Sequence, residues 1–251
     1  MNYKILPIKA FKDNYIWAIH DGVNVVIVDP GECIPVLQFL QEQRLSLVGI
    51  LITHEHADHI GGVNELIAKF PNVQVFGCGY QQYNDFDSFK LPELNLTCQV
   101  INAPGHTDNH VLFFVGDAHL FCGDVLFSFG CGRVFTGDFI AAFESLQKIK
   151  QLPTNTLIYP AHEYTQANLN FTLQIDNGNI SYYQVINDEV QTMLVEDGIS
   201  LPTTLANELK YNLFLRTGDV NVQDIISSKF GFQISDGFDC FVALRELRNN
   251  Y

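Results

Sequence analysis

The segment THEHADHIGG, residues 53–62, places three histidines and two carboxylates within six consecutive positions. It directly follows the apolar run LVGILI, which has the length and composition of a buried strand. Loops at the carboxyl ends of buried strands often carry functional residues. In an extended loop, side chains two residues apart share a side, so His54 and His56 converge on one point. Asp58 and His59 then face elsewhere, and the loop suits two adjacent zinc, iron or manganese ions.

Three further candidate ligands follow other strand-like runs. His106 lies in INAPGHTDNH, Asp124 in FCGDVLF and His162 in IYPAHEYT, and each comes after an apolar stretch. Two metal ions need about three protein ligands each and one ligand that both share. The seven side chains that make up this set are His54, His56, Asp58, His59, His106, Asp124 and His162.

Other interpretations of these residues are open at this point. The His-rich segment can be a solvated polar loop in which Asp58 only caps the helix that follows. His106 taken alone can be a loop histidine or a helix-capping histidine. We expect His110 to be a core histidine or to support a metal ligand. His20 and His119 lie in expected turns and should be exposed.

The composition limits what such a site can act on. The 251 residues are 47% hydrophobic and 12% aromatic, as in a globular protein with a sizeable core. A formal net charge of -14 repels polyanions and disfavours nucleic acid as a partner. No apolar run approaches the ~18 residues of a membrane span, and we expect no signal peptide. The six cysteines form no C-x-x-C pair, which predicts free thiols in a cytoplasmic protein.

Two regions of different character follow from the hydrophobic periodicity. Up to His162, short β-branched runs alternate with amphipathic stretches, as in layered α/β and α+β folds. Hairpin turns are expected at Asp21-Gly22 and Asp117-Ala118. Strands are expected over residues 15–20, 23–30, 47–53, 73–77, 96–104, 111–116, 119–127 and 155–162, and helices over 33–43, 61–70 and 143–152. Helical spacing then dominates, so we expect a catalytic domain over residues 1–163 and a helical domain over 164–251.

The chain resembles the metallo-β-lactamase superfamily and, within it, the glyoxalase II enzymes, the hydroxyacylglutathione hydrolases. The motifs that carry this resemblance occur in the family's order along nearly the whole chain: FKDNYIW, VDPG, THEHADHIGGV, APGHT, LFCGDVLFSFGCGR, AHEYT and LFLRT, followed by a basic tail. The metal motif alone indicates only the superfamily, whereas GCGR, HEYT and the helical tail narrow the resemblance. It implies an α+β fold, a four-layer αβ/βα sandwich with a C-terminal helical domain.

The resemblance also implies how the seven candidate ligands divide. Each of two divalent ions would have three ligands of its own, and one carboxylate would join the two sites. The assignment is His54, His56 and His106 for one ion, Asp58, His59 and His162 for the other, and Asp124 as the bridge. Zinc is the favoured metal, and the same ligand types also accept iron or manganese.

The activity that the resemblance implies is hydrolysis of S-(2-hydroxyacyl)glutathione, chiefly S-D-lactoylglutathione, to D-lactate and glutathione in methylglyoxal detoxification. In this family a hydroxide that bridges the metals attacks the thioester carbonyl, and Asp58 can orient it. The thiolate leaves readily because its reference pKa is only about 8.5. We therefore expect a cytoplasmic, monomeric enzyme that acts on a small glutathione thioester, with no nucleic-acid or membrane partner.

A glutathione conjugate carries carboxylates, so an acidic protein must hold it with local cations. The resemblance places Arg133, Phe135, Tyr164, Arg245 and Arg248 at the glutathione pocket. Phe135 stands where many relatives have tyrosine, the threonine after it stands at an often acidic position, and Arg248 replaces the usual lysine. Without the resemblance, Arg245 and Arg248 would be assigned to a solvated helix face.

Three other functions compete with this interpretation. Another hydrolase of the same fold, such as a lactonase or a β-lactamase, would share the metals but would not need the basic helical tail. An iron-dependent persulfide dioxygenase has a similar loop but uses a mononuclear site. A purely structural metal site needs neither a bridging carboxylate nor a second ion.

Overall fold

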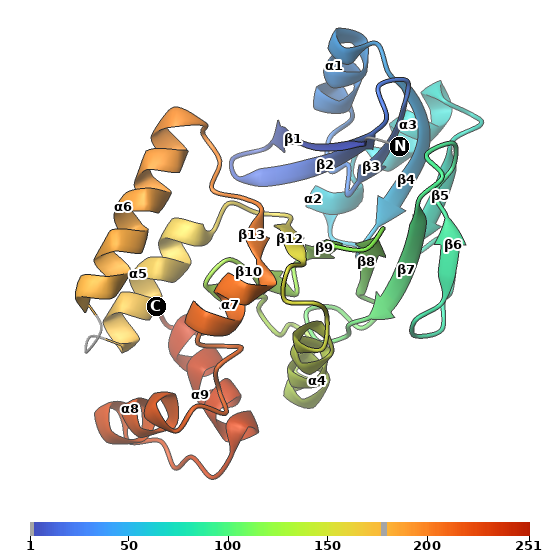
Figure 1. The fold of residues 1–251 in the computed structure, drawn as a ribbon. Helices are drawn as coiled ribbons and strands as arrows, with labels where there is room; N and C mark the ends of the chain where they lie inside the picture. The colour runs from blue at the N-terminus through green and yellow to red at the C-terminus, as the bar shows by residue number, and fades with distance from the viewer. Residues whose placement is uncertain (1–2, 177–179) are drawn as a thin grey trace.

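The first of two central sheets has the strand order β1-β2-β3-β4-β5 in the computed structural model, which describes residues 3–176 and 180–251 (Figure 1). Its strands are β1 (Lys4–Ala10), β2 (Asn14–His20), β3 (Asn24–Val28), β4 (Ser46–Ile52) and β5 (Gln74–Gly77). The first three pair antiparallel, and β3, β4 and β5 pair parallel. Because parallel neighbours need a crossover, α1 (Cys33–Gln43) connects β3 to β4, and the connection from β4 to β5 contains α2 (Ala57–Ile60) and α3 (Val63–Lys69).

The second sheet has the order β13-β12-β9-β8-β7-β6. Its strands are β6 (Ser88–Lys90), β7 (Thr97–Asn102), β8 (Val111–Val115), β9 (His119–Gly123), β12 (Leu157–Pro160) and β13 (Thr203–Thr204). β9 and β12 pair parallel, and they are connected through α4 (Phe139–Lys150). Between β9 and α4 the chain forms a separate two-stranded hairpin of β10 (Leu126–Phe127) and β11 (Gly130–Cys131).

Three apolar cores hold four layers together. Side chains alternate along each strand, so Trp17 and Ile19 of β2 face the second sheet while Ile16 and Ala18 face α1 and α3. The outer face of the second sheet packs against α4 and the C-terminal helices. The layer order is therefore helix, sheet, sheet, helix, which confirms the four-layer sandwich expected from the resemblance.

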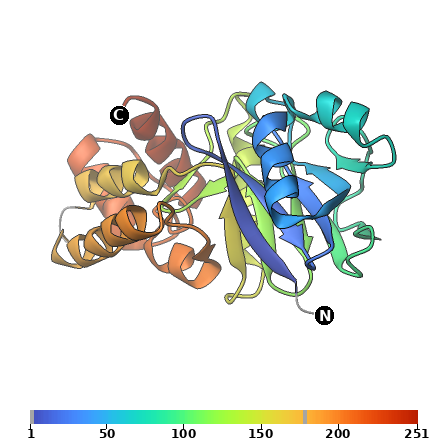
Figure 2. The ribbon, with the colours of Figure 1, turned by 90° about the horizontal axis from the view of Figure 1, so that it is seen from above.

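The C-terminal helices gather on one side of the sandwich, away from α1 and α3 (Figures 1 and 2). They are α5 (Thr165–Ile175), α6 (Ile180–Glu196), α7 (Leu205–Tyr211), α8 (Val220–Phe230) and α9 (Gly237–Asn249). Phe214, Phe241 and Leu244 extend the core that α4 shares with the second sheet. Where the first domain ends and the second begins stays a prediction. Among the described helices, none has the length and apolar content needed to cross a membrane.

Most expected elements are present, and the differences have local causes. The two expected hairpins join β2 to β3 and β8 to β9, and all six cysteines are free and buried. The edge strand β1 was not predicted because lysines and Pro7 break its alternation, and proline is tolerated there only because the strand lies at an edge. The strand expected over residues 119–127 is divided into β9 and β10, and the short elements β6, β11, β13 and α7 were not predicted, since each carries too few residues to show a period.

Candidate metal centre

The candidate ligands come from four connections that follow strands of both sheets. His54 follows β4 of the first sheet, and the second sheet contributes His106 after β7, Asp124 after β9 and His162 after β12. The Tyr15 N–H donates to the Ala161 carbonyl at 2.7 Å, so the two sheets are hydrogen-bonded beside this end. Residues far apart in the sequence therefore meet at one edge of the sandwich.

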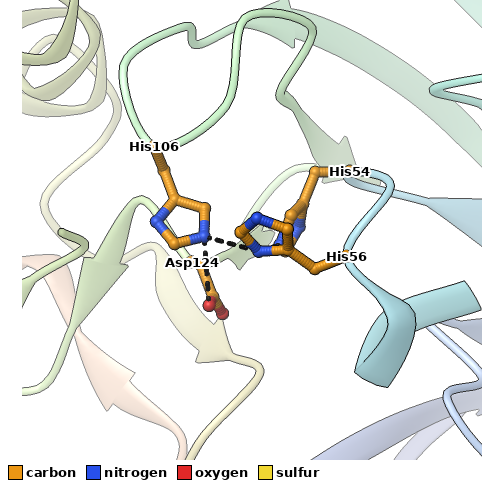
Figure 3. Close-up of side chains that lie close together, drawn as sticks. All are labelled: His54, His56, His106 and Asp124. Carbon is orange, nitrogen blue, oxygen red and sulfur yellow. Dashed lines mark hydrogen bonds and ion pairs between the residues drawn. The ribbon is translucent and has the colours of Figure 1, made fainter. Parts of the chain in front are cut away.

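Three histidines and a carboxylate form the first cluster (Figure 3). His56 Nδ1 lies 3.1 Å from His54 Nε2 and 3.1 Å from His106 Nε2. Asp124 Oδ2 lies 3.4 Å from His106 Nε2. These four side chains point toward one small volume between them, although they come from three separate connections.

The second cluster lies on the other side of Asp124. Asp58 Oδ2 is 3.5 Å from both His59 Nε2 and His162 Nε2. Asp124 Oδ1 lies 3.6 Å from His59 Nε2 and 3.4 Å from His162 Nε2. The two oxygens of Asp124 therefore face two different clusters, which is the geometry that a bridging carboxylate needs.

The hydrogen bonds around the histidines fit a pair of cations. His59 Nδ1 bonds Asp29 Oδ2 at 3.1 Å, His162 Nδ1 bonds Asp13 Oδ1 at 2.9 Å, and His106 Nδ1 bonds the Arg133 carbonyl at 2.8 Å. Each of these partners only accepts, so Nδ1 carries a proton and Nε2 faces the centre. Among the described residues, the buried atoms His59 Nε2 and Asp124 Oδ1 have no hydrogen-bond partner, as expected of atoms that bind a divalent metal.

The pKa values of the histidines differ between the two clusters. Burial acts to raise the pKa of Asp124, but the nearby histidines outweigh it and hold that pKa well below its ordinary value. Burial acts to lower the pKa of His59, but Asp124 and Asp29 raise it to about 9. Burial lowers the pKa of His54 and of His106 instead. Asp124 is therefore a carboxylate at neutral pH, and His54 is a neutral imidazole.

A helical turn changes the direction of the second half of the His-rich segment, residues 57–60. An extended loop was expected there from the sequence. After His56, residues 57–60 form α2, and this turn carries Asp58 and His59 toward the second cluster. The interpretation of Asp58 as the cap of the helix that starts near Gly61 is wrong, because that helix, α3, has Gly62 at its N-cap and no side-chain cap, and Asp58 lies inside α2. The Asp58 carboxylate instead accepts a bond from Asn14 Nδ2 at 3.0 Å.

Asp29 is a site residue that the sequence reasoning did not single out. Its Oδ1 accepts from Thr53 N at 2.7 Å, while its Oδ2 bonds Thr53 Oγ1 at 2.6 Å and His59 Nδ1 at 3.1 Å. One buried carboxylate thus fixes the end of β4 and one candidate ligand together. The motif VDPG contains Asp29, and the motif FKDNY contains Asp13 and Asn14, so these motifs could have indicated the residues that support the candidate ligands.

The remaining histidines divide between a correct and an incorrect expectation. His110 is buried, stacks on His54 with ring centroids 4.6 Å apart, and accepts from Asp124 N at 3.2 Å, so the expectation of a core histidine is confirmed and its support of a metal ligand stays a prediction. The expectation of exposure is wrong for His20, which is 7% exposed at the end of β2. It is also wrong for His119, which lies on β9, is partly buried and bonds Tyr159.

Two aromatic side chains lie beside the clusters. The Phe135 ring is 60% exposed and contacts His56 and His106 edge-on, with centroids 5.6 and 5.3 Å away. Tyr164 stacks on His162 at 4.7 Å. One ring therefore lies at each cluster, where each can contact a substrate held between them.

The three predicted arginines have different surroundings. Arg133 is exposed and lies over the Phe135 ring at 5.4 Å. Arg248 is half-buried and donates to Asn168 Oδ1 at 3.3 Å. Arg245 is only 4% exposed, and its Nη1 donates to the Cys131 carbonyl at 3.0 Å. A solvated helix face therefore does not describe Arg245.

Gly132 lets two parts of the site approach closely, and we expect Gly132→Ala to disrupt it. A Cβ at this position would lie 1.8 Å from the Asp124 carbonyl oxygen and 3.2 Å from His106 Nδ1. Because backbone must shift to relieve the clash, bound metal and turnover should both fall by more than about tenfold. Metal analysis and initial rates check this, with Gly218→Ala, where a Cβ meets nothing within 4 Å, as the matched control. Equal metal content and rates in the two variants would contradict the prediction.

Solved structures share this architecture. ETHE1 from Myxococcus xanthus superposes with a TM-score of 0.64 at 23% sequence identity, over 99% of this chain and 98% of that chain. This likeness shows the fold alone. Two family models match in sequence: "Metallo-beta-lactamase superfamily" over residues 12–76, and "Hydroxyacylglutathione hydrolase C-terminus" over residues 163–251.

Relatives that match this chain over most of its length are named hydroxyacylglutathione hydrolase. The hydroxyacylglutathione hydrolase of Tolumonas auensis is 39% identical over 98% of this chain and 99% of its own length. That of Haemophilus ducreyi is 44% identical over 86% of this chain and 94% of its own length. Identity at this level, extending through both the His-rich half and the helical half, shows that the chain belongs to the hydroxyacylglutathione hydrolase family of the metallo-β-lactamase superfamily.

Proposed function

We propose that this chain hydrolyses S-(2-hydroxyacyl)glutathione thioesters, chiefly S-D-lactoylglutathione, to D-lactate and glutathione. The observation that carries the proposal is the pair of ligand clusters on either side of Asp124, in a chain of this family. A mononuclear dioxygenase site would leave the second cluster without a role. The same enzyme activity would place the chain in methylglyoxal detoxification.

The ligand assignment is part of this proposal. Two divalent ions, zinc by preference and iron or manganese as alternatives, would be held by the two clusters with Asp124 between them. Bound there, they would lower the pKa of a shared water and polarise the thioester carbonyl. The ligands are His54, His56 and His106 on one side, Asp58, His59 and His162 on the other, and Asp124 in both sets.

The chain's own residues complete the chemistry. The Asp58 carboxylate is kept anionic: burial acts to raise its pKa, but the Asn14 bond and His59 lower it. It can therefore accept a hydrogen bond from the attacking water and orient it toward the carbonyl carbon. The leaving thiolate needs no strong acid, because a thiol of reference pKa about 8.5 departs far more easily than an amine.

The glutathione part of the substrate is proposed to lie along Arg133, Phe135, Tyr164, Arg245 and Arg248. Phe135 and Tyr164 lie at the clusters and can contact the thioester end. Arg248 donates to Asn168 Oδ1 at 3.3 Å, and the N–H of Asn168 donates to the Tyr164 carbonyl at 2.9 Å, so the guanidinium lies beside the first turn of α5 and can hold a substrate carboxylate there. Arg245 supports this face from below through the Cys131 carbonyl.

Arg248→Ala is expected to raise KM for the glutathione thioester about tenfold and to change kcat little. The proposed bond joins the Arg248 guanidinium to a substrate carboxylate, and a charge-assisted hydrogen bond of this kind contributes about 1.5–3 kcal/mol. This bond would be present in both the ground state and the transition state, so its loss changes KM and not kcat. Steady-state kinetics check this, with Lys69→Ala on α3 as the surface-charge control. An unchanged KM in Arg248→Ala would remove this residue from the proposed pocket.

The function itself is tested by following the loss of thioester absorbance with purified protein and S-D-lactoylglutathione. Turnover that stops on adding a chelator supports the proposal. Hydrolysis of a lactone or a β-lactam without thioester turnover would favour another hydrolase, and oxygen uptake with a glutathione persulfide would favour the dioxygenase. Either of those results would overturn the proposed function.

Further expectations belong with this proposal. The substrate is a small molecule, and the net charge of -14 disfavours nucleic acid. Cytoplasmic localisation, the monomeric state and a division into residues 1–163 and 164–251 stay predictions.

A further inference from the structure

The β10–β11 hairpin connects two parts of the proposed metal centre. Asp124 precedes it, and Arg133, whose carbonyl accepts from His106 Nδ1 at 2.8 Å, follows it. The Gly132 N–H donates to the Val125 carbonyl at 3.1 Å and closes the base of the hairpin. A movement of the hairpin therefore displaces the bridging carboxylate and turns one imidazole ligand.

The turn of this hairpin has an unfavourable backbone conformation. Phe129, one of its two turn residues, has a φ of 60°, in the left-handed region that bulky residues rarely adopt. Strain of this kind persists only where surrounding contacts hold it, and it is common near functional sites. The Phe129 ring packs with Leu169, Tyr183 and Val190 of the helical part, but apolar contacts alone do not fix a backbone N–H.

A buried carboxylate from α7 supplies the missing acceptor. Glu208 is 1% exposed. Its Oε2 accepts from Phe129 N at 2.9 Å and from Asn212 Nδ2 at 2.9 Å. Its Oε1 accepts from Ser128 Oγ at 3.2 Å and from Thr203 Oγ1 at 2.8 Å. All four donors are used by one side chain, and two of them belong to the hairpin turn.

Asn212 extends this support to the strands of the hairpin. The two hydrogens on its Nδ2 are shared among three acceptors: Glu208 Oε2 at 2.9 Å, the Phe127 carbonyl at 3.1 Å and the Gly130 carbonyl at 3.0 Å. Phe127 and Gly130 are the residues that flank the turn. The hairpin is thus held to α7 by buried hydrogen bonds at its turn and at both of its strands.

We propose that Glu208 is a positioning residue for the hydrolysis: by holding the turn of the β10–β11 hairpin, it keeps Asp124 and His106 in place at the metal centre. This role rests on the proposed function. It assigns to the C-terminal helical part a task besides substrate binding, since α7 fixes the geometry of ligands that lie in the sandwich.

The hydrogen-bond pattern predicts which substitution the site tolerates. In Glu208→Gln the amide oxygen can accept from Phe129 N and Asn212, while the amide nitrogen donates to the Ser128 and Thr203 hydroxyls, which can also accept. Glu208→Leu keeps a similar volume but leaves these donors without an acceptor. Glutamine at position 208 should therefore keep the hairpin turn in place, whereas leucine should not, because holding the turn requires a hydrogen-bond acceptor and does not require a negative charge.

The experiment measures kcat with S-D-lactoylglutathione and, separately, the zinc retained after dialysis against a weak chelator. For Glu208→Leu we expect both to fall about 10- to 100-fold, and for Glu208→Gln both to stay within about threefold of wild type. Val36→Ala, a core truncation in α1, is the control for a general loss of stability. Should Glu208→Leu not fold, Ser128→Ala and Thr203→Val form a matched pair that each removes one hydroxyl donor to the same oxygen.

Of this pair, only Ser128→Ala touches the hairpin, so it alone should reduce zinc retention. The proposal is overturned if Glu208→Leu behaves like Val36→Ala, if Glu208→Gln is as impaired as Glu208→Leu, or if the two hydroxyl variants are alike. A wild-type protein that does not hydrolyse the thioester refutes the proposed function instead, and zinc retention still tests the positioning role.

Discussion

Asp124→Asn is expected to lower kcat by at least about a thousandfold and to reduce the metal content of the purified protein. Both oxygens of this carboxylate are engaged, Oδ2 toward His106 and Oδ1 toward His59 and His162. Asparagine keeps the shape but turns an NH₂ group toward one cluster, where it cannot bind a cation. Metal-based charge stabilisation contributes several kcal/mol to a transition state, and each 1.36 kcal/mol is tenfold in rate.

Initial rates and elemental analysis on the same sample check this prediction. Asp117→Asn is the matched control, because Asp117 is exposed at the turn before β9, at the opposite end of the strand from Asp124. The variants should melt within a few degrees of each other once metal-free. An Asp124→Asn protein with normal turnover and a full metal complement would show that this residue does not join the two sites.

Metal removal is expected to reduce activity below about 1% of the starting value, and added zinc should restore it. In the metal-free centre, His59 must lose a proton before it can bind a cation. Burial acts to lower the pKa of His59, but Asp124 and Asp29 raise it to about 9. His162 also has a raised pKa, although burial opposes it, because of Asp124 and Asp13. Below pH 9 the incoming cation must displace the His59 proton, so metal affinity should fall as the pH is lowered.

Titration calorimetry of metal-free protein in buffers of different ionisation enthalpy measures this proton release directly. Near pH 7 each protein molecule should release about one proton or more on binding, and a cation at 100 times its Kd should stabilise the fold by about 2.7 kcal/mol. His119→Gln, which lies on β9 away from the clusters, should leave both values unchanged. Full activity in metal-free protein, or binding without proton release, would contradict the prediction.

Where the candidate ligands stand in the chain could be predicted from the sequence. The spacing in THEHADH and the position of His106, Asp124 and His162 after apolar runs depend on local pattern, and strands buried in a layered fold produce that pattern directly. Such runs also predicted β2, β3, β4, α1 and the two hairpins. The division of the ligands into two sets came from the resemblance. The clusters in the structure are consistent with that division, and direct metal analysis would test it.

Local pattern could not predict features that depend on partners distant in the sequence. Asp29 supports His59, and Glu208 supports Ser128 and Phe129, across gaps of 30 and about 80 residues. The motif VDPG draws attention to Asp29 and no motif draws attention to Glu208, and in neither case does the local pattern reveal which distant partner the buried acid will contact. His20 was misjudged for the same reason, since burial depends on the layer that packs over a strand end.

The composition and motifs of this chain therefore determined its chemistry: imidazoles and carboxylates at strand ends suited to divalent cations, in an acidic protein with few cations for its substrate. Tertiary structure alone decided how these groups are aimed. The turn of α2 directs Asp58 and His59 to the second cluster, Arg245 is buried beneath the site, and Asp124 lies between both clusters. The physical reason is that side-chain direction depends on backbone turns and on contacts between distant segments, which exist only once the layers have packed.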